Sequence, residues 1–246
     1  MAVKFDANNE PYLQLPPPHS QFRLTPTRET DAPVVIAAMN DPSVYMNFIA
    51  TPCPYLQQDW NAWFPILSNV TCKAVAELRE VEEWKRGGMV GERKWVGAGQ
   101  PFPAIRETDP ETGEERFLGE VAIRRATFRQ VKDEAEKKEM EERNLARKAG
   151  DPEIEWEMGF WLAPSAQGRG VMTVVLRALL NTFFVGYMNV QRLRGGYLEH
   201  NVGSKRVLEK CGFVYERKLA DFVEINEKKI GVKGKKANAV DMIWRP

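Results

Sequence analysis

Apolar positions recur along the chain at two spacings, one helical and one alternating, and together they predict a mixture of helices and strands. Residues 21–25 alternate and predict a short strand. A helix is expected next, because Thr27 suits an N-cap and the following apolar residues share one helical face. Asp41-Pro42 should end it. A longer helical pattern covers 60–81 and closes at the glycines of 87–88.

The middle of the chain predicts a hairpin followed by an exposed helix. Residues 103–107 and 116–124 have strand patterns, and the segment between them has the composition of a turn. Residues 131–148 are dominated by charge, with opposite charges four residues apart, which favours a solvated helix. We interpret 131–148 as a helical insertion in the domain. Contact with an acidic acceptor is the alternative role for it and for the Lys-rich loop 227–236.

The second half of the chain predicts the order β-α-β-α-β, which requires a sheet covered by helices with some parallel pairing. The expected elements are strand 154–162, helix 171–187, strand 192–198, helix 204–211 and strand 213–219, with a closing hairpin of 222–225 and 239–244. Residues 1–20 contain three consecutive prolines and are expected to form an extended arm. Residues 21–246 are expected to form a single domain.

Composition excludes several classes of protein. The net charge of +1 provides no overall field for nucleic acid or an anionic membrane. The three cysteines lie far apart, which argues against a disulfide framework and fits a reducing compartment. We expect no signal peptide and no membrane-spanning stretch of roughly 18 apolar residues, and therefore a cytoplasmic protein. The two histidines and the cysteine spacing predict no metal site.

The most informative segment is the junction between the strand ending at Leu162 and the helix opening near Gly170. Gly168 and Gly170 allow backbone N–H groups to point outward, and a helix N-terminus carries unpaired donors with partial positive charge. Such a junction suits a pyrophosphate. Arg169 either contacts phosphate or is an ordinary surface arginine. The junction matches neither the dinucleotide fingerprint, because Thr173 replaces its third glycine, nor the P-loop.

This stretch resembles motif A of the GNAT superfamily of N-acetyltransferases, with Gln167 first, Gly170 fourth and Met172 as a departure at the sixth position. The block from Asn201 to Phe213, with its Asn-x-x-Ser and Glu-Lys-Cys-Gly-Phe, resembles the branch that acetylates N-termini of ribosomal proteins (RimJ/RimL-like). The resemblance is strong over 154–219 and looser over 21–50 and 103–125. It implies a GNAT fold of the α/β (α+β) class, with a mixed sheet of about seven strands flanked by helices.

The resemblance also implies how acetyl-CoA is held. Two parallel strands should splay apart, and the pantetheine arm should lie between them. The residues implied in binding are Phe160, Trp161 and Leu162 through their backbone, Gln167, Gly168, Arg169, Gly170, Val171, Met172 and Thr173 in the pyrophosphate loop, and Asn201 and Ser204 near the thioester. Asn201 is otherwise explained as a helix N-cap.

The implied reaction is attack of a neutral amine on the thioester. An α-amine, with a pKa of about 7.7–8.0, loses its proton at pH 7 for about 1 kcal/mol, against about 4.6 kcal/mol for a lysine. Glu157, on the strand leading into the loop, is the first candidate base, with a salt-bridged role as its alternative. Glu120 is a further candidate. The tyrosine acid usual in the superfamily is replaced by Leu208, and the resemblance points to Ser204 as the donor to the thiolate.

The sequence therefore predicts an acyltransferase that moves an acetyl group from acetyl-CoA to a primary amine, on a peptide N-terminus or a small molecule. A CoA-binding sensor or scaffold on the same fold is the alternative. A monomer or homodimer is expected, without nucleic acid or membrane partners. Trp60 and Trp63 either border the acceptor pocket or pack in the core, and His200 is expected to be structural.

Overall fold

The computed structural model describes residues 2–246, and all of the strands in this range belong to one mixed sheet. The sheet has nine strands in the order β1-β2-β3-β4-β5-β6-β7-β9-β8. Neighbouring strands are antiparallel except for β6 and β7, which are parallel. The strands are β1 (Val3–Phe5), β2 (Pro11–Gln14), β3 (Phe22–Thr25), β4 (Ala104–Thr108), β5 (Glu115–Arg125), β6 (Glu155–Leu162), β7 (Arg192–Leu198), β8 (Val214–Glu224) and β9 (Lys236–Trp244).

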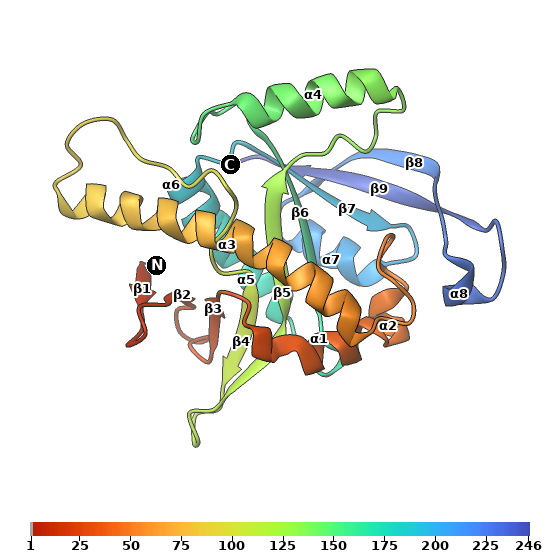
Figure 1. The fold of residues 1–246 in the computed structure, drawn as a ribbon, viewed down its shortest axis with the longest axis horizontal. Helices are drawn as coiled ribbons and strands as arrows, with labels where there is room; N and C mark the ends of the chain where they lie inside the picture. The colour runs from red at the N-terminus through yellow and green to blue at the C-terminus, as the bar shows by residue number, and fades with distance from the viewer. Residues whose placement is uncertain (1) are drawn as a thin grey trace.

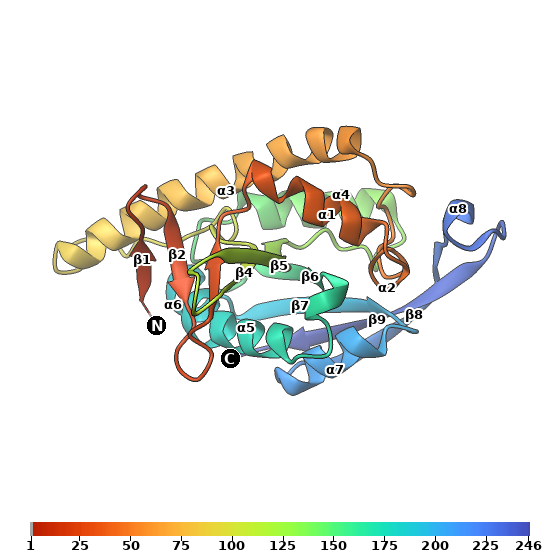
Figure 2. The ribbon, with the colours of Figure 1, turned by 90° about the horizontal axis from the view of Figure 1, so that it is seen from below.

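Helices cover both faces of this sheet (Figure 2). One face carries the short turn η1 (Glu29–Asp31), α1 (Ala32–Met39), α2 (Pro42–Tyr45), α3 (Gln57–Arg86) and α4 (Glu134–Ala146). The other face carries the short turn η2 (Pro164–Ala166), α5 (Val171–Ala178), the π-helical turn η3 (Leu179–Phe184), α6 (Val185–Met188) and α7 (Val202–Lys210). The short helix α8 (Glu227–Ile230) lies at the end of the β8–β9 hairpin. This arrangement confirms the predicted class of a mixed sheet flanked by helices.

The N-terminal segment differs from the extended arm that the prolines predicted. β1 and β2 pair with each other, and β2 pairs with β3, so this segment extends the sheet and accounts for two strands beyond the predicted seven. Leu13 and Leu15 are completely or almost completely buried. Burial of these two leucines supplies the free energy that orders the segment. The prediction of an extended arm rested instead on the prolines of residues 1–20.

Two local predictions were wrong in detail, and a third was correct but incomplete. Thr27 is not an N-cap, because its hydroxyl donates to the Glu120 carboxylate across the sheet face. α1 ends at Met39, just before Asp41-Pro42 as predicted, and the Asp41 side chain in addition accepts from the Ser43 N–H and caps α2. The expected separate strands near 213–219 and 222–225 are one bulged strand, β8.

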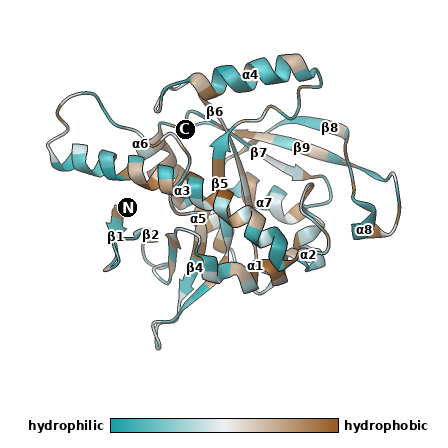
Figure 3. Cartoon of the chain, in the orientation of Figure 1, coloured by the Kyte–Doolittle hydropathy of each residue, from teal (hydrophilic) through white to brown (hydrophobic). Residues whose placement is uncertain are grey.

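The charged insertion forms α4, as its charge spacing predicted, and Figure 3 shows this helix as mostly hydrophilic. Its attachment to the sheet depends on Asn144, which is buried. The Asn144 amide donates to the Glu155 carbonyl at 2.9 Å and accepts from the Glu155 N–H at 3.0 Å. One side chain thus pairs with the backbone of β6 as a neighbouring strand would, and it fixes α4 at the end of the sheet where β6 begins.

The main core lies between the sheet and the helix that runs continuously through α5, η3 and α6. Val175, Leu179 and Phe183 of this helix are completely buried. Val171–Met188 is long and apolar enough to cross a membrane by length and composition, although the sequence analysis expected no such stretch. In the fold, 56% of this segment is buried against the sheet, which is the usual environment of a core helix.

A buried ion pair connects the sheet to the start of α1. The Arg106 guanidinium on β4 donates to both carboxylate oxygens of Asp31, at 2.9 and 2.8 Å, and its Nε donates to the Thr25 hydroxyl at 2.7 Å. The side chains of Arg106 and Asp31 are 4% and 5% exposed. Because neither charge is solvated, each depends on the other for compensation.

Asp31→Ala should therefore leave the Arg106 charge buried without its partner, and we expect the free energy of unfolding to fall by about 3–5 kcal/mol. Denaturant unfolding followed by fluorescence measures it. Glu142→Ala is the matched control, since its pair with Lys138 on α4 is exposed and should contribute less than about 0.5 kcal/mol. Equal losses in the two variants would contradict the structural role of the buried pair.

Candidate active site

The site is built where β6 and β7 stop pairing. Their parallel register runs from Glu155 opposite Arg192 to Met158 opposite Gly195 and goes no further. Beyond it, residues 159–162 of β6 still pair with β5. Their backbone edge toward β7 is therefore without a strand partner, which places unpaired donors and acceptors along a gap in the sheet. This geometry agrees with the predicted splaying of two parallel strands.

The loop between β6 and α5 presents backbone donors beside this gap. Gly168 and Gly170 have φ of +72° and +79°, the left-handed conformation that other residues adopt at a cost, and a Cβ at either would meet open space. Within residues 2–246, the N–H groups from Gly168 to Thr173 have no hydrogen-bond acceptor. These donors lie at the positive end of a helix, so the loop can accept a diphosphate.

The side chains of the loop are used differently from its backbone. Gln167 donates to the Leu162 carbonyl at 3.0 Å and so closes the loop onto the end of β6. Arg169 forms an ion pair with Glu107 on β4, with one contact at 3.2 Å. Arg169 and Arg116 together lower the pKa of the Glu107 carboxyl despite its partial burial. The Arg169 guanidinium is therefore held by a protein carboxylate, which fits the alternative of a surface arginine, and its backbone N–H is the group that remains free for a phosphate.

Asn201 and Ser204 lie at the start of α7, just after β7. The Asn201 Oδ1 accepts from the Ser204 N–H at 2.9 Å, which is the N-cap geometry given above as the alternative role. Within the described residues, the Asn201 amide nitrogen and the Ser204 hydroxyl have no hydrogen-bond partner. Capping and ligand binding are thus compatible here, because they use different atoms of the same two side chains.

Glu120 lies on the other face of the sheet, opposite Trp161 of β6 in the unpaired half of that strand. Its carboxylate accepts from the Thr27 hydroxyl at 2.7 Å and from the Trp161 indole at 3.2 Å. Burial raises the pKa of the Glu120 carboxyl, and the negative charge of Asp31 adds to the rise, while the two hydrogen bonds and Arg106 oppose it. A carboxylate with a raised pKa beside the strand gap is suited to accept a proton.

Glu157 is in a different environment, nearer the paired end of β6. Its carboxylate accepts from Arg124 Nε at 2.6 Å and from both the N–H and the hydroxyl of Thr127 at 3.1 Å. These contacts match the salt-bridged role stated above as the alternative for Glu157. Of the two carboxylates expected as bases, Glu120 has the more suitable surroundings.

Sequence reasoning missed the side chains that surround Glu120. Thr27 reaches it from the segment after β3 and the Trp161 indole from β6, which no local pattern could connect. Tyr55 is also close, since burial and then the charges of Asp59 and Glu120 raise its pKa to about 12. Both tryptophans lie on α3, where Trp60 is buried in the core and Trp63 is 48% exposed. The two tryptophans therefore have separate environments.

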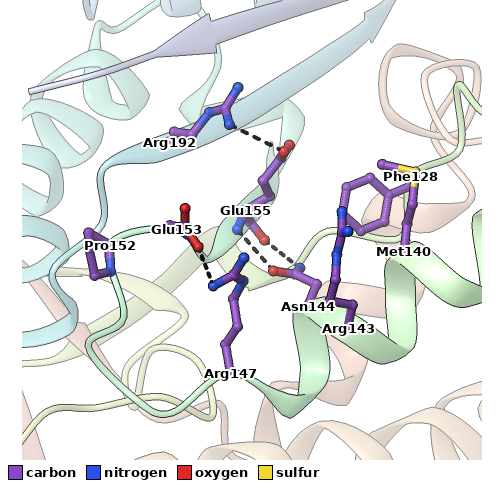
Figure 4. A pocket seen from close by; sticks show the side chains of 9 residues that line it. All are labelled: Phe128, Met140, Arg143, Asn144, Arg147, Pro152, Glu153, Glu155 and Arg192. Atoms are coloured by element: carbon purple, nitrogen blue, oxygen red, sulfur yellow. Dashed lines mark hydrogen bonds and ion pairs between the residues drawn. The ribbon is translucent and has the colours of Figure 1, made fainter.

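The insertion forms a cavity of about 230 Å³ of its own, at the paired end of β6 and β7 (Figure 4). Arg192 lies 3.5 Å from the Glu155 carboxylate, and Arg147 lies 2.6 Å from that of Glu153. Most charges that line this cavity are thus already paired. It is at the opposite end of β6 from the loop, so it does not belong to the anion site. Among residues 2–246, no group of three His, Cys, Asp or Glu side chains could hold a metal ion.

Comparison with known proteins agrees with this geometry. The family described as the acetyltransferase (GNAT) domain matches residues 21–214. The chain therefore belongs to the GNAT acetyltransferases, a family of acyltransferases. A curated relative, the probable N-acetyltransferase YjcK of Bacillus subtilis (strain 168), is 35% identical over 69 residues. That match spans 28% of this chain and 38% of the relative.

Solved structures show the same fold at low identity. RimL, a ribosomal L7/L12 alpha-N-protein acetyltransferase, is 11% identical, with a TM-score of 0.57 over 100% of both chains. Spermidine N-acetyltransferase from Vibrio cholerae, in complex with CoA and spermine, is 14% identical, with a TM-score of 0.52 over 92% of this chain and 96% of that one. At such identities the likeness supports the fold alone.

Gly170→Asp should weaken acetyl-CoA binding at least about tenfold, or 1.4 kcal/mol, because it places a negative charge among the loop donors. Titration calorimetry measures the affinity. Gly113→Asp is the control, since Gly113 has a similar φ of +73° and open surroundings in the β4–β5 turn. Equal affinities in the two variants would remove the loop from the anion site.

Proposed function

We propose that this protein transfers an acetyl group from acetyl-CoA to a primary amine in a ternary complex. The observation that carries the proposal is the row of unpaired N–H groups from Gly168 to Thr173 beside the gap between β6 and β7. A diphosphate in the loop would direct the rest of a CoA molecule along the free edge of β6. Its thioester would then lie between Glu120 on one face and Ser204 on the other.

Each part of the site has a distinct role in binding. The backbone of Phe160, Trp161 and Leu162 pairs with the pantetheine amides, as an additional strand would. The loop from Gln167 to Thr173 holds the diphosphate through Gly168, Arg169, Gly170, Val171 and Met172. The Asn201 amide nitrogen donates to the pantetheine arm, while its oxygen continues to cap α7.

Glu120 serves as the general base. The amine nitrogen attacks the thioester carbonyl carbon, and its proton passes to the Glu120 carboxylate directly or through one water. The C–N bond forms as the C–S bond breaks. The departing thiolate accepts a hydrogen bond from the Ser204 hydroxyl, which has no protein partner among residues 2–246, and later takes its proton from solvent. Glu157 keeps a structural role with Arg124 and Thr127.

An α-amine is the acceptor that this chemistry favours. Deprotonation of an α-amine costs less free energy at pH 7 than deprotonation of a lysine side chain. The Asn201–Phe213 block also resembles the branch that acetylates N-termini of ribosomal proteins. The solved neighbours are named for a ribosomal-protein N-terminus and for spermidine, so both peptide and polyamine acceptors belong in a screen. We place the enzyme in the cytoplasm as a single domain over 21–246, acting as a monomer or homodimer.

Thiol release measures the proposed activity. Purified protein is mixed with acetyl-CoA and a library of peptides, amino acids and polyamines, and free CoA is quantified. Amine-dependent release identifies the acceptor. CoA binding without release across the library would instead favour a sensor or scaffold.

Glu120→Gln should lower kcat/KM by about 10²–10⁴-fold, because the amide cannot accept the proton. Because the pKa of Glu120 is raised, the wild-type activity should fall as pH decreases through a value above the ordinary 4.5. The variant should lack this limb and keep only the one that protonation of the acceptor amine gives to both proteins. A pH profile of kcat/KM on both proteins measures it, and a larger loss in Glu157→Gln would move the base to Glu157.

Ser204→Ala should reduce kcat by about tenfold or more while leaving the affinity for acetyl-CoA nearly unchanged, since the hydroxyl acts on the leaving thiolate. The backbone N–H that contacts Asn201 remains in the variant. Steady-state kinetics and calorimetry together separate the two effects. Turnover equal to that of the wild type would exclude Ser204 from the reaction.

A further inference from the structure

Thr27 connects Glu120 to a second cavity that the proposed reaction does not use. This cavity, of about 270 Å³, lies between α3, the β1–β2 turn and the segment after β3, where Figure 2 shows α3 crossing the N-terminal strands. It is lined by Asn9, Pro11, Pro26, Thr27, Ser68, Thr71, Cys72, Val75 and Arg79. Thr27 is therefore in contact with both the cavity and the Glu120 carboxylate.

The lining of the cavity suits water. Ser68 and Thr71 lie one helical turn apart on α3, and their hydroxyls have no hydrogen-bond partner within residues 2–246. Arg79 lies at its edge and donates to the Asn9 carbonyl at 2.9 Å. The volume accommodates several waters, and a water needs only two to four polar partners.

Thr27 is held rigidly in this position. Arg106 donates to the Thr25 hydroxyl at 2.7 Å, to the Pro26 carbonyl at 3.4 Å and to Asp31 on the far side. The segment that carries Thr27 is thus fixed on both sides by one buried guanidinium. Its hydroxyl is only 2.7 Å from Glu120 Oε1, which is a distance suited to proton transfer.

Glu120 is half-buried, and as a base it must release the proton that it gains in each turnover. The groups that face Glu120 are Thr27, Trp161, Tyr55, Asp31 and Arg106. The pKa of Tyr55 is about 12, Asp31 and Arg106 are paired with each other, and the Trp161 indole is only a donor. Among these groups, the Thr27 hydroxyl alone combines donor and acceptor character with a route to a cavity.

We infer that the proton taken up by Glu120 leaves through the Thr27 hydroxyl into water in this cavity, on the side of the sheet away from CoA. Protonated Glu120 donates to Thr27 Oγ1 while Thr27 passes its own proton to a cavity water. The products are a carboxylate, a neutral threonine and a hydronium that exchanges with solvent. The inference rests on the proposed function with Glu120 as its base.

Thr27→Val keeps the shape of the side chain and removes the hydroxyl. We expect kcat to fall about tenfold and the solvent deuterium isotope effect on kcat to increase, because proton release becomes limiting, while KM for acetyl-CoA stays the same. Thr27→Ser restores a hydroxyl and should return both quantities toward the wild type. A threonine that only supports the fold would not produce this isotope effect, so wild-type values in Thr27→Val overturn the inference.

A second pair of variants tests the cavity without touching Glu120. Ser68→Leu fills the cavity with an apolar side chain, and Asn69→Leu makes a similar change at the next, exposed position of α3 outside the lining. We expect Ser68→Leu to lower kcat severalfold without moving the acid limb of the pH profile, and Asn69→Leu to have no effect. Equal kcat in the two variants overturns the route through the cavity.

The outcomes also separate this inference from the proposed function. Full activity in Glu120→Gln would show that Glu120 is not the base. The proton that Thr27 is proposed to release would then have no source, and both proposals would fail. Loss of activity in Glu120→Gln together with wild-type kinetics in Thr27→Val and Ser68→Leu leaves the base in place and overturns only the exit route.

Discussion

The structure depends on where hydrogen bonding between β6 and β7 ends. As far as Met158 and Gly195 the two strands pair through their backbone N–H and C=O groups. Beyond that point the backbone of β6 has a free edge inside an otherwise continuous sheet. Unpaired backbone groups are costly when buried, so such an edge persists only if something else can occupy it. The loop donors and the start of α7 are positioned around this same point, one after each of the two strands.

The two faces of the sheet divide the chemistry between them. The α5–α7 face supplies neutral donors: backbone N–H groups, the amide of Asn201 and the hydroxyl of Ser204. The opposite face supplies charge, with Glu120 supported by Thr27 and Trp161 and the Arg106–Asp31 pair nearby. The loop donors and the Glu120 carboxylate thus lie on opposite faces of one sheet, so an anion bound at the loop would be kept away from the charge of Glu120.

Much of this was predictable from local patterns. The glycines of the loop, the apolar helix after it and the β-α-β-α-β order are local signals, and the fold contains them where they were expected. The environment of Glu120 was not predictable, because Thr27 lies 93 residues from it and its hydroxyl had a plausible local use as a cap. The strands of the N-terminal segment were missed for a similar reason, since their order comes from burial against β3 and not from their own composition.

The attachment of α4 has an evolutionary consequence. Asn144 pairs with both backbone groups of Glu155 at the first residue of β6, so the inserted segment completes the hydrogen bonding of the strand that leads to the gap beside β7. Deletion of the insertion would expose that strand end. The Glu155 carbonyl would still accept from the Ala126 N–H at 2.9 Å, but the Glu155 N–H would lose its acceptor. Relatives with a shorter connection between β5 and β6 would therefore need another acceptor for the equivalent N–H, and gain or loss of this helix should coincide with a compensating change at the beginning of the strand.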